Sequence, residues 1–296
     1  MGERSILPDR GVVSVTGPDA KKLLAGLVTN DMALLDRQPA LYAALLTPQG
    51  KILFDFLIAA ADGGYLLDTD RARAPDLAKR LSLYKLRADV AIADLSGAFD
   101  VGVAWGDDAH PLAAGDLVYA DPRLAALGVR WLARRDGIPR DEAGDQPATS
   151  DDNAAAYHAH RVALGVPQGG RDFDFGDIFP HEALLDQLHG VSFTKGCFVG
   201  QEVVSRMQHR TTVRKRVVMV EAASALPGDR PAVTIGAAEI GRLGSVSGVH
   251  GLALLRIDRV AEAQRDGLAV TAAGHALAVR VPPFATFEIK GSHEVA

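Results

Sequence analysis

The spacing of apolar residues in the first third of the chain predicts a helix followed by a β-hairpin. Residues 16–32 carry apolar positions at helical spacing, and Pro18 suits the first turn of a helix. Residues 52–69 form two apolar runs around Asp62-Gly63-Gly64, a turn that typically joins two paired strands. The apolar face of the predicted helix consists of Leu23, Leu24, Leu27 and Val28.

The next segment predicts a second helix and two further strands. Residues 74–86 are amphipathic, with Leu77, Leu81, Tyr84 and Leu86 on the apolar side. An order of hairpin, helix and strands is typical of an α+β layer, in which helices cover one face of an antiparallel sheet. The two strands are expected at 89–95 and 99–106.

The second half of the chain has a different pattern. Residues 136–153 are polar and rich in Asp, Gly and Pro, which indicates a loop or a domain boundary. Residues 153–165 predict a helix that ends at Gly165. From Arg214 onward the chain consists of short β-rich runs interrupted by glycines, which predicts a small barrel or sandwich.

Composition limits the functional classes. A chain of 296 residues is long enough for two or three domains. A net charge of −5 and a pI of about 6.0 argue against a dedicated nucleic-acid binder. No apolar run is long enough to span a membrane. The single cysteine cannot form an internal disulfide, so we expect a reducing, cytoplasmic location.

That cysteine lies in the segment FTKGCFVGQEVVSRM, residues 193–207. Apolar spacing predicts a helix from about Cys197 to Met207, so the thiol would lie at a helix N-terminus. Backbone N–H groups at that end and the Lys195 cation would favour the thiolate. Gly196 and Gly200 leave room for close approach by another group. The alternative is a structural cysteine at a tight turn.

One thiol also limits metal chemistry. Iron–sulfur clusters and structural zinc sites normally take four protein ligands, which a single cysteine cannot supply. We therefore predict no resident metal site. Any contact between Cys197 and a metal or cluster is expected to be transient or shared with a partner.

The segment KGCFVGQE, with Arg206 four residues after Glu202, resembles the K-G-C-[FY]-x-G-Q-E-x-x-x-R signature of the YgfZ family. That family comprises folate-binding iron–sulfur cluster maturation proteins within the glycine-cleavage T-protein superfamily of aminomethyltransferases. Further similarity covers nearly the whole chain, including VTGPDAKKLLAGLVTNDM, LLTPQGKILFDF, YHAHRVALGVPQGGRD and EIGRLGSVSG.

The resemblance implies an α+β protein whose three domains form a ring, with tetrahydrofolate or a derivative in the central hole. Residues 1–47 and 150–210 would form a discontinuous folate-binding domain that carries the motif. Residues 48–149 would form an inserted ferredoxin-like domain, and 211–296 a C-terminal β-barrel.

The resemblance also implies site residues. Cys197 and Lys195 are the candidate catalytic residues. Gly196, Gly200, Gln201, Glu202 and Arg206 are expected to support the motif, and the i, i+4 spacing of Glu202 and Arg206 permits a helix ion pair. The predicted folate contacts are Tyr157, Arg10, Asp31, Asp55 and Arg161. Of these, Tyr157 can stack on a pterin, whereas Arg10 departs from the aromatic type.

Two departures separate the chain from the T-protein aminomethyltransferases. Phe54 replaces the first residue of their Asp-Asp pair, and Ala163 replaces the Glu of their Arg-Leu-Glu-Ala-Gly segment. Carboxylates that hold a pterin and manage protons are hard to replace by Phe and Ala.

The favoured hypothesis is therefore a monomeric accessory factor that uses folate and Cys197 to assemble or repair iron–sulfur clusters. Its partners would be client enzymes and assembly proteins. The alternatives are a folate-dependent one-carbon transferase, which is the enzyme class expected if the protein is an enzyme, and a binding module with a structural cysteine.

Overall fold

The computed structural model describes residues 3–107, 117–137, 152–210 and 213–290. The chain divides into two compact units. The first comprises residues 1–157 and 188–201, and the second comprises residues 158–187 and 202–296.

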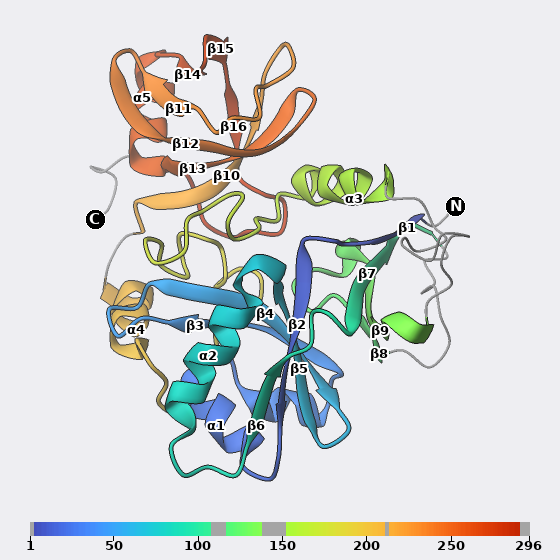
Figure 1. Cartoon of the computed structure of the whole chain (residues 1–296). Coiled ribbons are helices and arrows are strands. Elements are labelled where there is room, and N and C mark those ends of the chain that lie inside the picture. Colours follow the sequence, from blue (N-terminus) through green and yellow to red (C-terminus); the bar gives the residue numbers. More distant parts are fainter. Residues whose placement is uncertain (1–2, 108–116, 138–151, 211–212, 291–296) are drawn as a thin grey trace. The chain divides into compact units, whose positions relative to one another are not determined.

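The first unit is built on a five-stranded antiparallel sheet of order β3-β4-β5-β2-β6. Two helices, α1 (Ala20–Leu27) and α2 (Ala74–Lys85), pack on this sheet, and the fully buried Leu24, Leu77 and Leu81 belong to their shared core (Figure 1). The strands are β2 (Arg10–Thr16), β3 (Ala40–Leu46), β4 (Ile52–Ala61), β5 (Gly64–Asp70) and β6 (Ala91–Asp94). The predicted helices and hairpin are confirmed.

A four-stranded antiparallel sheet of order β1-β7-β9-β8 completes the first unit. Trp131 of β9 lies opposite Gly102 of β7, and its ring is fully buried. A Cβ atom on Gly102 would lie 2.1 Å from the Trp131 ring, so only glycine fits there. The strands are β1 (Glu3–Ile6), β7 (Phe99–Trp105), β8 (Leu117–Ala120) and β9 (Val129–Arg134).

The second unit contains a seven-stranded antiparallel sheet of order β15-β14-β11-β12-β13-β10-β16. Pairing shifts at two points, between Val233 and Thr234 and between Leu243 and Val246, as expected where bulges bend a sheet. Helix α5 (Ile257–Asp266), which the sequence pattern did not predict, contributes Ile257, Val260 and Ala263 to the core of this sheet. The strands are β10 (Lys215–Glu221), β11 (Ala232–Ile235), β12 (Ala238–Ser247), β13 (His250–Arg256), β14 (Val270–Ala272), β15 (His275–Ala276) and β16 (Ala278–Arg280).

Two more α-helices and four short 3-10 helices complete the description. Helix α3 (Asp152–Ala163) agrees with the predicted helix, and Gly165 follows with the positive φ that ends it. None of the helices among the described residues is long and apolar enough to cross a bilayer. The short helices are η1 (Met32–Asp36), η2 (Arg71–Arg73), η3 (Ala125–Leu127) and η4 (Arg135–Gly137), and the remaining α-helix is α4 (Gln201–Arg210).

Two helix details differ from the sequence predictions. Helix α4 begins at Gln201 and not near Cys197, because Gly200 has a φ of +80° that helical backbone cannot adopt. Leu86 lies beyond the last residue of α2 and is 88% exposed, so it takes no part in the apolar face.

The compact units divide the chain differently from the three predicted domain ranges. Strands β3 and β4 pair with each other across the predicted boundary between residues 47 and 48. The units instead divide after residues 157, 187 and 201. The three-domain division stays a prediction.

Two glycine-to-alanine substitutions should have opposite effects on stability. Gly102→Ala forces a methyl group into the buried Trp131 ring and should lower the free energy of unfolding by about 1–3 kcal/mol. Gly26→Ala lies on an exposed turn of α1 with no atom within 4 Å and should raise it by about 0.5–1 kcal/mol. Urea denaturation of both variants checks the pair, and two changes of the same sign would contradict the packing described.

Candidate functional site

Cys197 is exposed and lies in an irregular loop that leads into α4. The loop runs along the connection between α1 and β3. Two side chains of that connection hold it: Thr29 Oγ1 donates to the carbonyl of Gly190 at 2.6 Å, and Asn30 Nδ2 donates to the carbonyl of His189 at 2.6 Å. The backbone N–H of Ser192 donates in turn to the carbonyl of Thr29 at 3.0 Å. The loop is therefore fixed at its base, while the thiol stays accessible as expected.

Lys195 is the main anchor of this loop. Its Nζ atom donates hydrogen bonds to the carbonyls of Ala25 (2.8 Å), Val28 (2.7 Å) and Asn30 (2.9 Å) at the C-terminal end of α1. A lysine ammonium has three N–H donors, so all three are used. The same end of a helix favours a positive charge.

This arrangement differs from the one the sequence suggested. Lys195 was expected to favour the Cys197 thiolate, but a hydrogen bond to the thiolate would require one of the three carbonyl bonds to break. The helix N-terminus lies four residues beyond the thiol, at Gln201. The observed contacts of Lys195 are those of a positioning residue, and a catalytic part for it stays a prediction.

The surroundings of Lys195 change its protonation. Burial lowers the pKa of Lys195 to about 8, and the nearby Asp31 carboxylate opposes that shift. Nζ also lies 5.1 Å from the centre of the Phe198 ring, whose side chain is buried. An amine so placed exchanges its proton much nearer to neutral pH than an ordinary lysine.

The two glycines of the motif have different surroundings. A Cβ atom on Gly200 would lie 2.6 Å from the carbonyl oxygen of Thr47 and 3.0 Å from Gly50, so the loop packs directly on the turn between β3 and β4. Gly196 has no atom within 4 Å of such a Cβ. The close approach expected at Gly200 is therefore made by the protein itself, and only Gly196 borders open space.

The last three motif residues lie at the start of α4. Gln201 Oε1 accepts a hydrogen bond from the backbone N–H of Phe198 at 3.3 Å, which supports the loop as predicted. Glu202 and Arg206 are both exposed, and they form no ion pair with each other. They line a hollow of about 440 Å³ together with Ser205 and His209. The ion pair that their spacing permits is therefore not formed in this structure.

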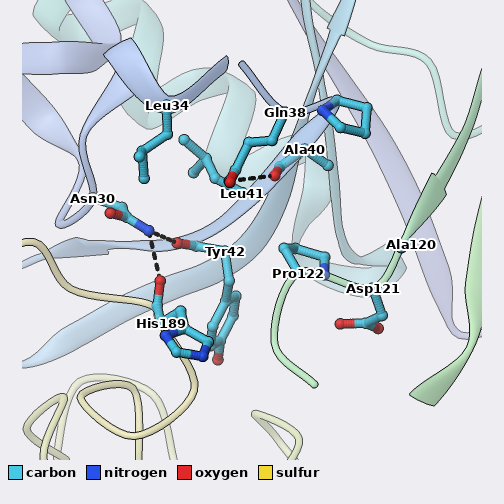
Figure 2. Close-up of a pocket in the computed structure, with 11 residues that line it drawn as sticks. Asn30, Leu34, Gln38, Ala40, Leu41, Tyr42, Ala120, Asp121, Pro122 and His189 are labelled. Carbon is cyan, nitrogen blue, oxygen red and sulfur yellow. Dashed lines mark hydrogen bonds between the residues drawn. The ribbon is translucent and has the colours of Figure 1, made fainter. Parts of the chain in front are cut away.

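A pocket of about 500 Å³ lies elsewhere in the first unit (Figure 2). Its wall includes Tyr42 of β3, and Figure 2 shows the Tyr42 ring between His189 on one side and Pro122 and Asp121 on the other. His189 is exposed and has a positive φ of 57°, which is uncommon for a residue other than glycine. The other lining residues are Asn30, Leu34, Gln38, Pro39, Ala40, Leu41 and Ala120.

Most polar groups of the pocket are already bonded within the protein. Asp121 accepts four hydrogen bonds from Arg123 and Arg130, which fill the acceptor positions of its carboxylate. The Tyr42 hydroxyl donates to Asp55 Oδ2 at 2.9 Å. The pocket therefore offers apolar walls and two aromatic rings, and Tyr42 connects it to the buried Asp55.

Behind the pocket lies a buried network of arginines and aspartates. Asp68 of β5 is fully buried and accepts hydrogen bonds from Arg10 Nε at 2.7 Å and from Arg130. Arg130 also donates to Asp121 at 3.0 Å, and Asp121 pairs with Arg123 at 2.6 Å. Burial alone would raise the pKa of Asp121, but the paired arginines outweigh that effect and hold it at about 2.

The structure brings three of the predicted folate contacts together around this network. Arg10 belongs to it directly. Burial raises the pKa of Asp55, while the Arg10 charge opposes that shift. Tyr157 is buried between the Trp105 ring, 5.4 Å away, and the Arg130 guanidinium, 6.0 Å away. The two aromatic rings are tilted by 58° and not stacked, so the stacking of Tyr157 on a pterin stays a prediction.

The other two predicted contacts have local structural partners. Asp31 caps η1 by accepting from the backbone N–H of Ala33 at 2.9 Å. Arg161 lies in the second unit, where it pairs with Asp172 at 2.8 Å and donates to Ser245 Oγ at 2.5 Å. Asp172 also accepts from the backbone N–H of Ser245, so Arg161 and Asp172 clamp β12 to the segment after α3.

Sequence reasoning missed Tyr42, His189 and the charged residues Asp68, Asp121 and Arg130. A signal was present for two of them: Asp68 and Arg130 interrupt otherwise apolar strands, and a charge inside a buried strand needs a partner. The identity of those partners depends on pairs up to 62 residues apart, which no local pattern encodes.

The proton of Lys195 provides a direct test of the anchor. Nuclear magnetic resonance titration of the lysine side chains, with Lys195→Met to assign the signal, should give a midpoint near the pKa of about 8 and well below the ordinary 10.5. Between pH 8 and pH 10.5 the lysine is protonated in the unfolded chain but largely neutral in the folded chain. The contribution of Lys195 to the free energy of unfolding therefore rises with pH in this range. The exposed Lys22 serves as the control, and equal midpoints for the two lysines would contradict a buried anchor.

Comparisons with known proteins show the fold. The family model of the CAF17 C-terminal β-barrel domain matches residues 214–287. The whole structure is similar to the crystal structure of glycine cleavage system aminomethyltransferase T from Bartonella henselae, with a TM-score of 0.68 at 16% identity, over 96% of this chain and 86% of that chain. The predicted α+β class and the C-terminal barrel are confirmed.

Curated relatives are similar in sequence over most of the chain. The mitochondrial iron–sulfur cluster assembly factors IBA57 of Mus musculus and Homo sapiens are each 33% identical, over 86% of this chain and 77% of theirs. The mitochondrial IBA57 homolog of Mycosarcoma maydis is 39% identical over 226 residues, which are 72% of this chain and 55% of the relative. The match thus spans little more than half the length of that fungal relative.

These relatives correct one expectation. All three carry the word mitochondrial in their names, which overturns the cytoplasmic location expected here. The inference failed because a lone cysteine excludes an internal disulfide but does not distinguish one reducing compartment from another. The finer resemblance to the YgfZ family stays a prediction. With a third of its residues identical to the mouse and human proteins over most of both chains, this chain belongs to the IBA57 family of iron–sulfur cluster assembly factors.

Proposed function

We propose that this protein assists the assembly or repair of iron–sulfur clusters in client enzymes and that Cys197 is the group that meets the cluster. The observation that carries the proposal is an exposed thiol on a loop that Lys195 fixes to α1, in a member of an iron–sulfur assembly family. A thiol so placed can reach a partner protein without unfolding any element. Its partners are client enzymes and other assembly proteins.

The chemistry of the contact follows from the ligand count. Among the described residues, no group of three or more His, Cys, Asp or Glu side chains is placed to hold a metal ion. Cys197 therefore supplies one of the four ligands that a cluster normally needs, and the partner supplies the others. In this step the thiol loses its proton to solvent, and its sulfur bonds to an iron atom that stays at the same oxidation state.

A reduced folate is the proposed cofactor, and the pocket beside Tyr42 is its proposed site. A volume of about 500 Å³ lies within the usual range of small-molecule sites, roughly 300–1,000 Å³. Tyr42 and His189 offer aromatic faces for a pterin ring. Asp55 does not line the pocket, but its Oδ2 accepts a hydrogen bond from the Tyr42 hydroxyl and so helps to hold the Tyr42 ring in the pocket wall. A bound tetrahydrofolate would supply a reduced pterin that is readily oxidised.

The transferase alternative has less support from the structure. Phe54, where aminomethyltransferases carry an Asp, is buried in the core shared with α1 and α2, and its ring lies 4.8 Å below the Arg73 guanidinium. Ala163 ends α3 without a side chain that can move a proton. The binding-module alternative differs from the proposed function in its need for Cys197, because only a binding module would keep its function without the thiol.

Replacement of Cys197 tests the proposed function. In cells that lack the endogenous protein, wild type and Thr194→Ala should restore the activities of several iron–sulfur enzymes, whereas Cys197→Ser should restore little or none at equal protein abundance. Thr194 is an exposed neighbour in the same loop and serves as the matched control. Full rescue by Cys197→Ser would mean that the thiol takes no part.

Calorimetry with tetrahydrofolate tests the cofactor separately. We expect His189→Asn to weaken tetrahydrofolate binding about tenfold. The variant loses one aromatic contact, worth about 1.4 kcal/mol, which corresponds to a tenfold change in the dissociation constant. Asparagine tolerates the positive φ at this position, so the backbone should be retained. His250→Asn, an exposed position in the second unit, should bind as wild type does. Absence of binding at millimolar ligand, or unchanged affinity in His189→Asn, would exclude this site.

A further inference from the structure

Two leucine side chains, Leu83 of α2 and Leu86 just after it, are exposed to solvent. Leu77 and Leu81 are fully buried against the sheet. Leu83 is 64% exposed and Leu86 is 88% exposed, the two highest values among the large apolar residues described. Side chains this exposed add little buried area to the fold, so most of their apolar surface is available to a partner.

The two leucines form a short ridge with a basic rim. Lys79 and Leu83 are spaced i, i+4, which places them on one side of α2, and Leu86 follows directly after the last helical residue, Lys85. Arg80 and Arg87 are exposed beside them, and neither takes part in an ion pair with another described residue. The segment 74–89 carries four cationic and two acidic side chains, in a chain whose net charge is −5. The basic rim is therefore a local departure from the charge of the molecule.

The ridge is held rigidly. The N–H of Ala88 donates to the carbonyl of Lys85 at 2.8 Å, and the N–H of Asp89 donates to Asp19 Oδ2 at 2.9 Å. Leu86 itself has a φ of 46°, a conformation that is costly for a branched side chain. A backbone segment that is already fixed loses little freedom when a partner covers it.

We propose that the end of α2 and the two residues that follow it, together Lys79 to Arg87, are a docking surface for an acidic protein partner whose apolar groove receives Leu83 and Leu86. Charge complementarity selects the partner, because carboxylates around such a groove would face Lys79, Arg80 and Arg87. An anionic membrane is a poorer match. Helices that bind membrane surfaces insert a long apolar face, whereas the apolar face of α2 is already buried in the protein. The inference does not depend on the thiol or on folate.

Photo-crosslinking in cells tests the surface. Benzoylphenylalanine at position 83 should give one discrete adduct, which mass spectrometry identifies as an acidic protein. The adduct should fall at least tenfold when Lys79→Glu and Arg80→Glu are introduced together. The same probe at position 268, a 56% exposed leucine in the second unit, is the matched control. No adduct, the same adduct from position 268, or an adduct with a second copy of this chain would overturn the proposal.

Leu86→Gly separates docking from folding. Glycine accepts the positive φ without cost, so this variant should be at least as stable as wild type and should still lose the adduct at least tenfold. A retained adduct would overturn the proposal. Sedimentation with vesicles of equal parts phosphatidylcholine and phosphatidylserine provides the last test, since binding that requires Leu83 and Leu86 would assign the ridge to a lipid surface instead.

Discussion

The first unit depends on the buried carboxylate of Asp68. This group is fully inaccessible to solvent, and it holds Arg10 of the five-stranded sheet and Arg130 of the four-stranded sheet at once. A buried charge without its partner costs about 3–5 kcal/mol, so neither arginine can leave while Asp68 stays ionised. The two sheets are therefore joined by the ion pairs of Asp68, which tolerate little displacement of one sheet against the other. Asp121 repeats the arrangement with Arg130 and Arg123, and it forms part of the pocket wall.

The pocket and the thiol loop share one support, the connection between α1 and β3. Asn30 lines the pocket, and its side chain donates to the carbonyls of both Tyr42 and His189. The carbonyl of the same residue accepts a hydrogen bond from Lys195, two residues before the thiol. A ligand that moved His189 or Tyr42 would therefore act on the base of the loop through Asn30. This is a physical route by which occupancy of the pocket could alter the presentation of Cys197 without any contact between ligand and thiol.

The spacing of apolar residues and the turn residues predicted those elements that local interactions determine. The hairpin over 52–69 and helices α1 and α2 follow from spacing and turn residues, and all three are present. The start of α4 was predicted too early, because helical spacing continues through Gly200 while its backbone is held left-handed against Thr47. The network around Asp68 was beyond prediction, since its partners lie far apart in the chain. Of the folate contacts expected from resemblance, Arg10 is already bonded to Asp68, and Tyr157 is buried in tilted contact with the Trp105 ring.

The loop geometry bears on how the thiol acts. A nucleophilic cysteine normally depends on nearby positive charge or a helix N-terminus to favour the thiolate. Here the three donors of Lys195 are committed to carbonyls, and the first helical residue lies four positions beyond the thiol. A nucleophilic role would therefore require a positive charge that Lys195 does not direct at the thiol in this arrangement. Coordination to a metal ion requires no such charge, because the metal itself removes the proton from a thiol. The proposed role of cluster ligand thus demands less of the loop than a nucleophilic role would.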